Sequence, residues 1–226
     1  MSNVAIILGA GAGTRMKSDK NKMLIDIMGK AVIERSVETF NAIADIDEII
    51  VTAREQEIEK YIELLDYDNV TFVIGGDTRQ QSVFNAVETI EEADLIVIHD
   101  GARPFVKEED IEKTIRAAME FGAVAVGVPV KDTIKVVDGD NMVVDTPDRS
   151  TLFAVQTPQT FRFELYKNAM EKAIEDSKVF TDDCGLVEYY GAKVKMVEGD
   201  YSNIKITTPD DISLAENILL KRIRKG

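Results

Sequence analysis

Short aliphatic runs alternate with amphipathic segments along the first 130 residues of the chain. The aliphatic runs lie at residues 4–8, 48–51, 70–74, 95–99 and 123–130. Continuous apolar runs of this length are typical of strands that are buried on both faces of a parallel sheet. Apolar residues at helical spacing predict helices between them, at 31–40, 55–65 and 108–121. The pattern therefore predicts an α/β fold with a Rossmann-like, mainly parallel β-sheet flanked by helices.

The alternation breaks after Val130. Residues 134–146 hold two short β-prone runs on either side of Asp138-Gly139-Asp140-Asn141, a turn cluster that is typical of a β-hairpin. Because this hairpin lies outside the βαβ rhythm, we expect it to protrude as an arm over about residues 132–149. Its Val-rich strands favour pairing with a second copy and hence a homodimer, although an ordinary surface hairpin has the same pattern.

Helical patterns return at 164–175, after Thr181 and after Thr208. Thr181 is the expected N-cap of a helix with acidic residues in its first turn, and Gly191 is the expected residue just beyond its end. The chain contains no internal repeat, linker or low-complexity tract. We therefore expect a single domain over residues 1–226, with the arm as its one extension.

Composition limits the partners and the kinds of site. A formal net charge of −14, from 41 acidic and 27 basic residues, argues against nucleic acid as a partner. The apolar run after Met1 is too short to cross a bilayer, and no basic segment precedes it, so we expect a cytoplasmic protein with no membrane partner. A single Cys184 and a single His99 exclude a disulfide within the chain and a Cys- or His-rich metal site. A divalent cation would have to bind carboxylates and ligand phosphates.

Positive charge lies beside a glycine-rich segment that follows the first strand. Residues 9–13 read Gly-Ala-Gly-Ala-Gly, and Arg15, Lys17, Lys20 and Lys22 come soon after. Small residues at a strand end allow backbone N–H groups to approach a phosphate chain, and nearby cations can neutralise charge in phosphoryl or nucleotidyl transfer. The spacing matches neither the dinucleotide-binding glycine pattern nor a P-loop. On charge alone, a solvated basic loop would be the better explanation, and the glycines favour an anion site instead.

Several motifs occur in order along the chain. They are Gly9-Ala10-Gly11-Ala12-Gly13-Thr14-Arg15-Met16, Gly75-Gly76-Asp77-Thr78-Arg79 with Ser82-Val83, His99-Asp100-Gly101-Ala102-Arg103-Pro104, Val130-Lys131-Asp132-Thr133-Ile134-Lys135, Thr157-Pro158-Gln159, Thr181-Asp182-Asp183 and Asn203-Ile204-Lys205-Ile206-Thr207. Together they resemble the cytidylyltransferases that activate polyol phosphates, most closely those of the non-mevalonate isoprenoid pathway. The resemblance runs over nearly the whole chain. It implies transfer of CMP from CTP to 2-C-methyl-D-erythritol 4-phosphate, with Mg²⁺ or another divalent cation bound mostly through CTP phosphates.

The resemblance also implies roles for individual residues. The nucleotide would be lined by Ala10, Gly11, Ala12 and Gly13 and would be contacted at its base and ribose by Gly76, Asp77 and Ser82. The catalytic cations would be Arg15, Lys22, Arg149 and Lys205, of which the first two stabilise the α-phosphorus and the departing pyrophosphate. The acceptor would be held by Asp100, Arg103, Thr133, Arg149, Thr157 and Lys205, with Asp100 also near the metal. The arm would carry Thr133 and Arg149 into the site of the neighbouring subunit.

Simpler explanations exist for some of these residues. His99 ends an apolar strand and is expected to be packed and hydrogen-bonded rather than catalytic, and Cys184 is expected to be packed. Arg149 on its own would be an ordinary surface cation. Where the family usually has Pro-Lys-Gln, this chain has Asn21-Lys22-Met23, which predicts a less rigid approach to Lys22; Ser202 likewise replaces a frequent acid.

Alternative functions remain at this point. Ribitol 5-phosphate or a related alditol phosphate could be the acceptor, since acceptor choice can depend on few contacts. A noncatalytic nucleotide-binding regulator would bind CTP but would leave the acceptor cations without a purpose. A dinucleotide-dependent oxidoreductase is disfavoured, because no acidic residue follows the second strand at Val51-Thr52 to bind a ribose.

Overall fold

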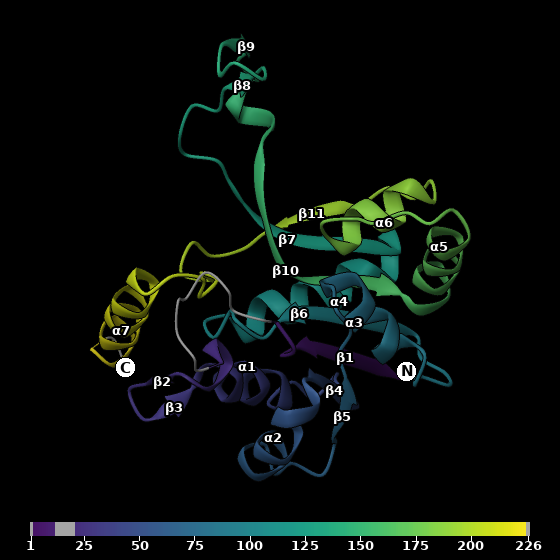
Figure 1. The fold of residues 1–226 in the computed structure, drawn as a ribbon, viewed down its shortest axis with the longest axis vertical. Coiled ribbons are helices and arrows are strands. Elements are labelled where there is room, and N and C mark those ends of the chain that lie inside the picture. The colour runs from purple at the N-terminus through teal and green to yellow at the C-terminus, as the bar shows by residue number, and fades with distance from the viewer. Residues whose placement is uncertain (1, 12–20, 225–226) are drawn as a thin grey trace.

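A seven-stranded sheet forms the centre of the computed structural model, which describes residues 2–11 and 21–224 (Figure 1). Its strands are β1 (Asn3–Leu8), β4 (Glu48–Ala53), β5 (Val70–Ile74), β6 (Leu95–Asp100), β7 (Ala123–Pro129), β10 (Phe153–Arg162) and β11 (Lys195–Glu198), in the order β11-β7-β10-β6-β1-β4-β5. All neighbours are parallel except β10, which is antiparallel to both β6 and β7. The predicted mainly parallel sheet is confirmed, and all five predicted strands are present.

The central strand β1 shows why an uninterrupted apolar run was needed. All six of its residues are buried. Ala5 and Ile7 pack into the hydrophobic cluster on one face of the sheet, whereas Val4 and Ile6 pack into the cluster on the other. Side chains alternate between faces along a strand, so a strand covered on both sides reads as a nearly continuous apolar run, here Val4 to Leu8.

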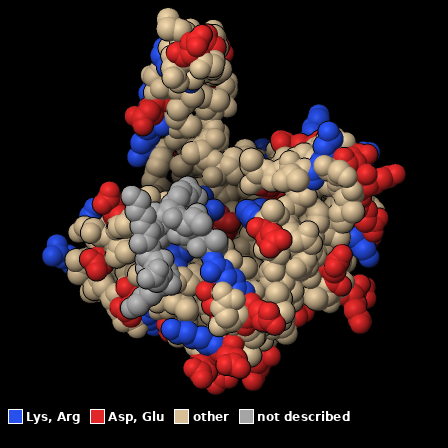
Figure 2. Space-filling view, viewed as in Figure 1, with Lys and Arg blue, Asp and Glu red and all other residues tan. Residues whose placement is uncertain are grey.

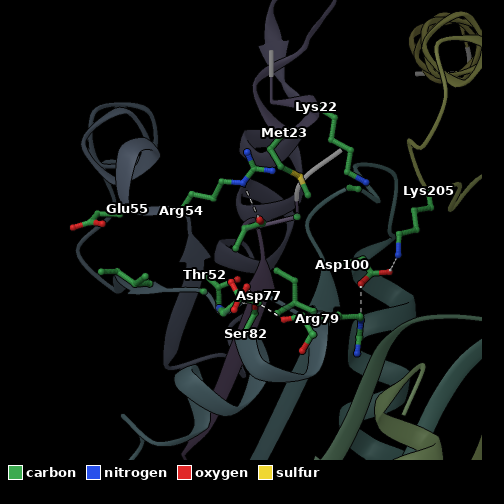
Figure 3. Close-up of a pocket in the computed structure, with 18 residues that line it drawn as sticks. Lys22, Met23, Thr52, Arg54, Glu55, Asp77, Arg79, Ser82, Asp100 and Lys205 are labelled. Atoms are coloured by element: carbon green, nitrogen blue, oxygen red, sulfur yellow. Dashed lines mark hydrogen bonds and ion pairs between the residues drawn. The ribbon is translucent and has the colours of Figure 1, made fainter. Parts of the chain in front are cut away.

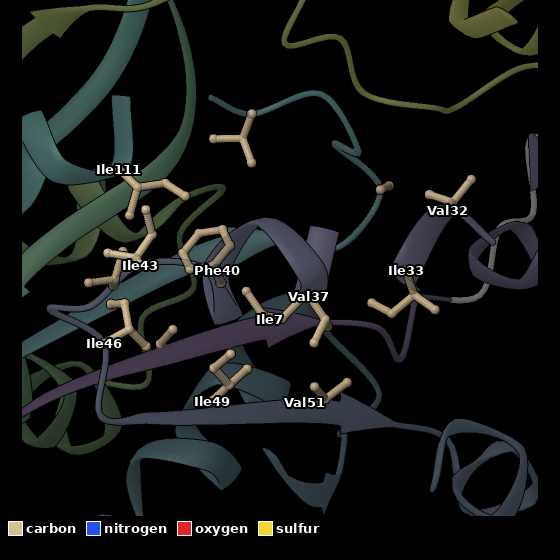
Figure 4. Close-up of a cluster of buried hydrophobic side chains, with 14 of the residues drawn as sticks. Ile7, Val32, Ile33, Val37, Phe40, Ile43, Ile46, Ile49, Val51 and Ile111 are labelled. Atoms are coloured by element: carbon tan, nitrogen blue, oxygen red, sulfur yellow. The ribbon is translucent and has the colours of Figure 1, made fainter. Parts of the chain in front are cut away.

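Helices cover both faces of the sheet. The first cluster includes residues of α1 (Val32–Asn41), α2 (Ile58–Leu64), α4 (Glu108–Phe121) and α7 (Asp210–Ile223), and the second includes residues of α3 (Arg79–Val87), α5 (Phe163–Glu175) and α6 (Asp183–Tyr189). Figure 4 shows Val37 and Phe40 of α1 above Ile7 and Ile49 of the sheet. The predicted helices are confirmed, and α3 is an additional one.

Helix α6 begins one residue later than predicted and ends as predicted. Its N-cap is Asp182, whose carboxylate accepts a hydrogen bond from the Gly185 N–H at 3.0 Å, rather than Thr181, one residue earlier. Gly191 follows the helix with a φ of 102°, a left-handed conformation that favours glycine, as predicted. Cys184 is packed inside α6, as expected, and burial, followed by the charge of Asp182, raises the pKa of its thiol.

A slender arm stands away from the body of the molecule (Figures 1 and 2). It carries the two-stranded sheet β8 (Val136–Val137) and β9 (Val143–Asp145) and the 3₁₀ helix η4 (Arg149–Thr151). The predicted hairpin is therefore present. Its apolar side chains lie on the surface of this chain: Val136, Val137, Met142, Val143 and Val144 are 44–66% exposed.

The remaining short elements lie near the glycine-rich segment and α1. They are the hairpin β2 (Asp26–Ile27) and β3 (Lys30–Ala31), and the 3₁₀ helices η2 (Lys22–Leu24) and η3 (Glu55–Glu57). Within the described ranges, no helix combines the length and the apolar composition that a membrane span requires.

Candidate active site

A cavity of about 470 Å³ opens at the carboxyl edge of the sheet (Figure 3). Strands β1, β4, β5 and β6 run parallel and end there, at Leu8, Ala53, Ile74 and Asp100. This edge is the usual ligand crevice of an open α/β sheet. The cavity is lined by Leu8, Ala10, Gly11, Lys22, Met23, Thr52, Arg54, Glu55, Ile74, Gly75, Gly76, Asp77, Thr78, Arg79, Ser82, Asp100, Ala102 and Lys205.

Two glycine segments pack against each other in the wall of the cavity. The Gly9 N–H donates to the Thr52 carbonyl at 2.9 Å, and a Cβ atom on Gly9 would lie 2.6 Å from that oxygen. A Cβ atom on Gly75 would lie 2.3 Å from Cβ of Ala10. Both positions therefore exclude any side chain, and their smallness leaves backbone accessible to a ligand.

The second glycine segment is fixed to the start of α3. Ser82 Oγ accepts a hydrogen bond from the Gly76 N–H at 3.1 Å and lies 3.0 Å from the Thr78 carbonyl, to which it donates. Thr78 caps α3 through a hydrogen bond from the Gln81 N–H. The predicted nucleotide residues Gly76, Asp77 and Ser82 thus lie together at the cavity.

Two lysines from distant parts of the chain lie on the same side of this cavity (Figure 3). The side chain of Lys22 is largely buried, and its amine donates to the Ile206 carbonyl at 3.2 Å. The amine of Lys205 lies 2.6 Å from Oδ2 of Asp100. The loop after β11 therefore supplies one cation and a backbone oxygen that holds the other.

Asp100 is surrounded by cations. Its carboxylate lies 3.3 Å from Arg79, 2.6 Å from Lys205 and 3.8 Å from Arg103. Burial alone would raise the pKa of Asp100, but these three cations outweigh it and lower the pKa well below its usual range. Arg79 also pairs with the buried Asp183 at 2.7 Å. Asp100 is therefore an anion at neutral pH, and its charge is balanced by the protein.

A smaller cavity of about 240 Å³ adjoins the first and shares Arg79, Asp100 and Lys205 with it. Its other lining residues are Arg103, Val155, Gln156, Thr157, Gln159, Thr181 and Asp182. The structure thus brings together four of the predicted acceptor residues, namely Asp100, Arg103, Thr157 and Lys205.

His99 lies behind this cavity as a packed residue with two polar contacts. Its Nε2 lies 3.2 Å from the Arg103 carbonyl and its Nδ1 lies 3.0 Å from Thr157 Oγ1. A carbonyl can only accept, so Nε2 carries the proton and Nδ1 accepts from the threonine hydroxyl. Burial lowers the pKa of His99 to about 4. The neutral ring therefore orients Arg103 and Thr157, and the predicted packing role is confirmed.

Two predicted site residues lie elsewhere in this chain. Thr133 and Arg149 are exposed on the arm and line neither cavity, and Arg149 donates to the Lys131 carbonyl at 2.6 Å. Arg15, Ala12 and Gly13 fall outside the described residues.

Three residues with clear contacts were given no role by the sequence. Arg79 stands inside a recognised motif but pairs with two acids from distant segments. Arg54 lines the cavity and donates to the Ala10 carbonyl at 3.2 Å. Tyr61, in α2, reaches the residue that follows β1, with its hydroxyl 3.1 Å from the Gly9 carbonyl. Such long-range pairings have no local sequence signal.

Asn21 adds contacts that a proline could not make. Its Oδ1 accepts from the Met23 N–H at 3.0 Å, and its Nδ2 donates to the Tyr61 hydroxyl at 3.2 Å. The predicted loss of rigidity before Lys22 followed from the missing proline ring alone, and these two contacts act against that loss.

The described residues include no group of three or more His, Cys, Asp or Glu that could hold a metal ion. Asp100 offers a carboxylate at the cavity, but both of its oxygens face cations. This donor set fits a divalent ion that arrives on phosphate oxygens and takes at most a few ligands from the protein.

Comparisons with known proteins give one consistent result. The family model described as "IspD: 2-C-methyl-D-erythritol 4-phosphate cytidylyltransferase" matches residues 3–221. Proteins of that name from Caldanaerobacter subterraneus subsp. tengcongensis and Clostridium novyi are 49% and 42% identical, over 98% and 96% of this chain and 100% and 96% of their own length. The crystal structure of 4-diphosphocytidyl-2C-methyl-D-erythritolsynthase from Anaerococcus prevotii superposes with a TM-score of 0.89 at 38% identity, covering 97% of this chain and 96% of that one. The range matched by the family model contains the residues that line both cavities and those of the arm.

Proposed function

The chain belongs to the 2-C-methyl-D-erythritol 4-phosphate cytidylyltransferase family, and from this premise we propose how its residues divide the work. It is a nucleotidyltransferase that transfers CMP from CTP to 2-C-methyl-D-erythritol 4-phosphate in non-mevalonate isoprenoid synthesis. An oxygen of the acceptor phosphate attacks the α-phosphorus of CTP, and the bond from that phosphorus to the bridging oxygen breaks. The products are 4-diphosphocytidyl-2-C-methyl-D-erythritol and pyrophosphate.

The observation that carries the assignment of residues is that Lys22, Lys205 and Asp100 line one cavity, and that Lys205 and Asp100 also line the cavity that adjoins it. The acceptor phosphate is already a competent nucleophile near neutral pH, so the reaction needs no general base. It needs in-line positioning and cations that allow two anions to approach. Lys22 and Lys205 supply that charge, and Arg15 joins them in this proposal.

CTP is placed in the larger cavity. Ala10, Gly11, Ala12 and Gly13 would line its phosphates, and Gly76, Asp77 and Ser82 would contact its base and ribose. The close packing of Gly75 on Ala10 supports this placement, because it joins the two segments that the nucleotide would touch.

The acceptor is placed in the smaller cavity. Arg103, Thr157 and Lys205 line it, and Asp100 stands between it and the nucleotide. The phosphate of the acceptor would compete with Asp100 for Lys205, so the Lys205 amine would leave Asp100 and bind the phosphate. Mg²⁺, or another divalent cation, would be held by triphosphate oxygens with Asp100 nearby, and it would screen phosphate charge.

We further propose that residues 1–226 form a single domain whose arm, about residues 132–149, joins two copies into a homodimer in the cytoplasm. The exposed valines of β8 and β9 support pairing with a second copy. Thr133 and Arg149 would then complete the acceptor site of the partner subunit. Neither residue lines a cavity of its own chain, which supports that arrangement.

Pyrophosphate release from CTP, with and without 2-C-methyl-D-erythritol 4-phosphate, tests the reaction, and ribitol 5-phosphate serves as the competing acceptor. Lys22→Ala should lower kcat by roughly 10²–10³-fold, because a cation at the developing charge is lost. Lys193→Ala, at an exposed lysine before β11, is the matched control and should be unchanged. Equal turnover by Lys22→Ala and wild type would refute the assigned role.

Mixing two inactive variants tests the shared site. Lys205→Ala and Arg149→Ala dimers, once their subunits are exchanged, should recover about a quarter of wild-type activity, because half of the dimers are mixed and each holds one intact site. No recovery in exchanged dimers would show that Arg149 does not act across the interface.

A further inference from the structure

The strand end at Gly9 and the residue before Lys22 are joined through one tyrosine. The hydroxyl of Tyr61 lies 3.1 Å from the Gly9 carbonyl and 3.2 Å from Nδ2 of Asn21. It donates to the first, because a carbonyl only accepts, and it accepts from the second, because an amide nitrogen only donates. We propose that Tyr61 and Asn21 are positioning residues, which hold Lys22 at a fixed place relative to the Gly9 backbone for nucleotidyl transfer. This inference rests on the proposed role of Lys22.

The Tyr61 ring is fully buried and packs directly on Gly9. A Cβ atom on Gly9 would lie 2.9 Å from Cε2 of the ring. Burial, followed by the negative charge of Glu57, raises the pKa of Tyr61 far above its ordinary value. The hydroxyl therefore stays protonated near neutral pH and can donate to the Gly9 carbonyl.

Asn21 passes this anchor on to Lys22. Its Oδ1 accepts from the Met23 N–H at 3.0 Å and its carbonyl accepts from the Leu24 N–H at 3.0 Å, so it starts the short helix η2 that contains Lys22. One end of the asparagine amide is thus bound to η2 and the other to Tyr61. The backbone from which the Lys22 side chain extends is fixed relative to α2 and β1.

Tyr61 acts from behind the site rather than within it. It is not among the residues that line the cavity, whereas Gly9 is followed at once by Ala10 and Gly11, which are. Arg54 adds a parallel anchor, because it donates to the Ala10 carbonyl. Two successive carbonyls just after β1, those of Gly9 and Ala10, therefore accept hydrogen bonds from side chains of the β4–α2 segment.

A positioning role predicts coupling that simple packing does not. Tyr61→Phe keeps the ring and removes only the hydroxyl, and it should lower kcat about tenfold while KM for the acceptor changes less than about twofold. Asn21→Ala should give a similar loss. The double variant should be no worse than the worse single variant, because both substitutions break the same connection.

A rescue variant separates position from stability. The φ of Asn21 is −58°, a value that proline adopts. Asn21→Pro fixes the backbone before Lys22 without help from Tyr61, so in that background Tyr61→Phe should cost only about twofold in kcat. Thr114→Val, which removes a buried hydroxyl that bonds Ile111 and Thr160, controls for stability and should leave kcat unchanged.

The kinetics and a CTP titration keep this inference separate from the proposed reaction. If wild type releases no pyrophosphate, the proposed function fails, and the dissociation constant for CTP then tests Tyr61, with about fivefold weaker binding expected for Tyr61→Phe. Wild-type kcat and CTP affinity in Tyr61→Phe would overturn the inference. Losses that multiply in the double variant, or that only follow the unfolded fraction in thermal melts, would overturn it as well.

Discussion

Replacing Asp100 by asparagine tests the electrostatic balance at the centre of the site. The carboxylate holds Arg79, Lys205 and Arg103 within 3.8 Å, and Asp100→Asn removes its charge while keeping its shape. At an effective dielectric constant of 20, each pair 4 Å apart has an attraction of about 4 kcal/mol, most of which the loss of hydration offsets.

The net loss should be about 3 kcal/mol in the free energy of unfolding, the low end for a broken buried ion pair. The low end applies because the Lys205 and Arg79 side chains are 34% and 27% exposed and regain water. Arg79 also keeps Asp183. For a chain of this length the melting temperature should fall by roughly 6–12 °C.

The pH dependence gives a second signature. Arg79, Lys205 and Arg103 outweigh burial and lower the folded-state pKa of Asp100 below the unfolded value of about 3.9. The stabilisation is therefore complete above that value and is lost as pH falls below it. Thermal melts should show a constant gap between wild type and variant from pH 8 to about 5, and a shrinking gap below about pH 4.

Asp176→Asn, which removes an exposed partner of Lys172, is the control and should melt with wild type. A variant that melts at or above the wild-type temperature at neutral pH would refute the reasoning. A gap that stays constant down to pH 3 would refute the assigned pKa direction.

Three further predictions use other features of the fold. The free energy of unfolding should fall as pH drops from 6.5 toward 4, because burial lowers the folded-state pKa of His99 to about 4 while the unfolded chain still takes up a proton; His99→Gln should abolish that slope, and an unaltered slope would contradict the assignment. Gly75→Ala should weaken CTP binding about tenfold or more by clashing with Ala10, whereas Gly139→Ala, which has open space around it, should bind as wild type does; equal affinities measured by calorimetry would count against the nucleotide site. Val143→Glu should convert the proposed dimer to a monomer in sedimentation runs, because it places a charge among exposed apolar arm residues; an unchanged sedimentation coefficient would rule the arm out as the interface.

The sequence predicted the parallel strands well, because burial on both faces leaves an unbroken apolar signature such as Val4 to Leu8. It missed β10, which holds Gln156, Pro158 and Gln159 in the middle of the sheet. The two glutamines bond to distant partners, as when the Gln159 side-chain oxygen accepts hydrogen bonds from the N–H groups of Asp183 and Cys184 in α6. A strand stabilised in this way has no local apolar pattern.

Helix α3 was missed for a related reason. Its sequence begins Arg79-Gln80-Gln81-Ser82, a polar first turn that Thr78 caps, and Gln80 bonds to the distant Lys178 and Phe180. The sequence brought Gly76, Asp77 and Ser82 forward only through their motif. Arg79 shares that motif, but its two acidic partners are 21 and 104 residues away, so its place at Asp100 required the folded chain.

In the candidate site too, motifs identify some residues and only the folded structure identifies others. Lys22, Lys205 and Asp100 could be named from motifs, and the structure brings them to one cavity. Tyr61 and Arg54 lie in a helix and a strand end with no recognisable motif, and only the meeting of β1 with the β4–α2 segment gives them a purpose.

Cys184 turns the protein into its own reporter of unfolding. It is the single thiol of the chain, it is 7% exposed, and burial raises its pKa, so alkylating reagents should leave the native state unmodified. Modification then occurs only when α6 opens, and one added mass per molecule counts opened chains directly. A pulse-labelling experiment followed by mass spectrometry could therefore measure how much CTP, or any inhibitor, reduces the opening of α6, without an introduced label.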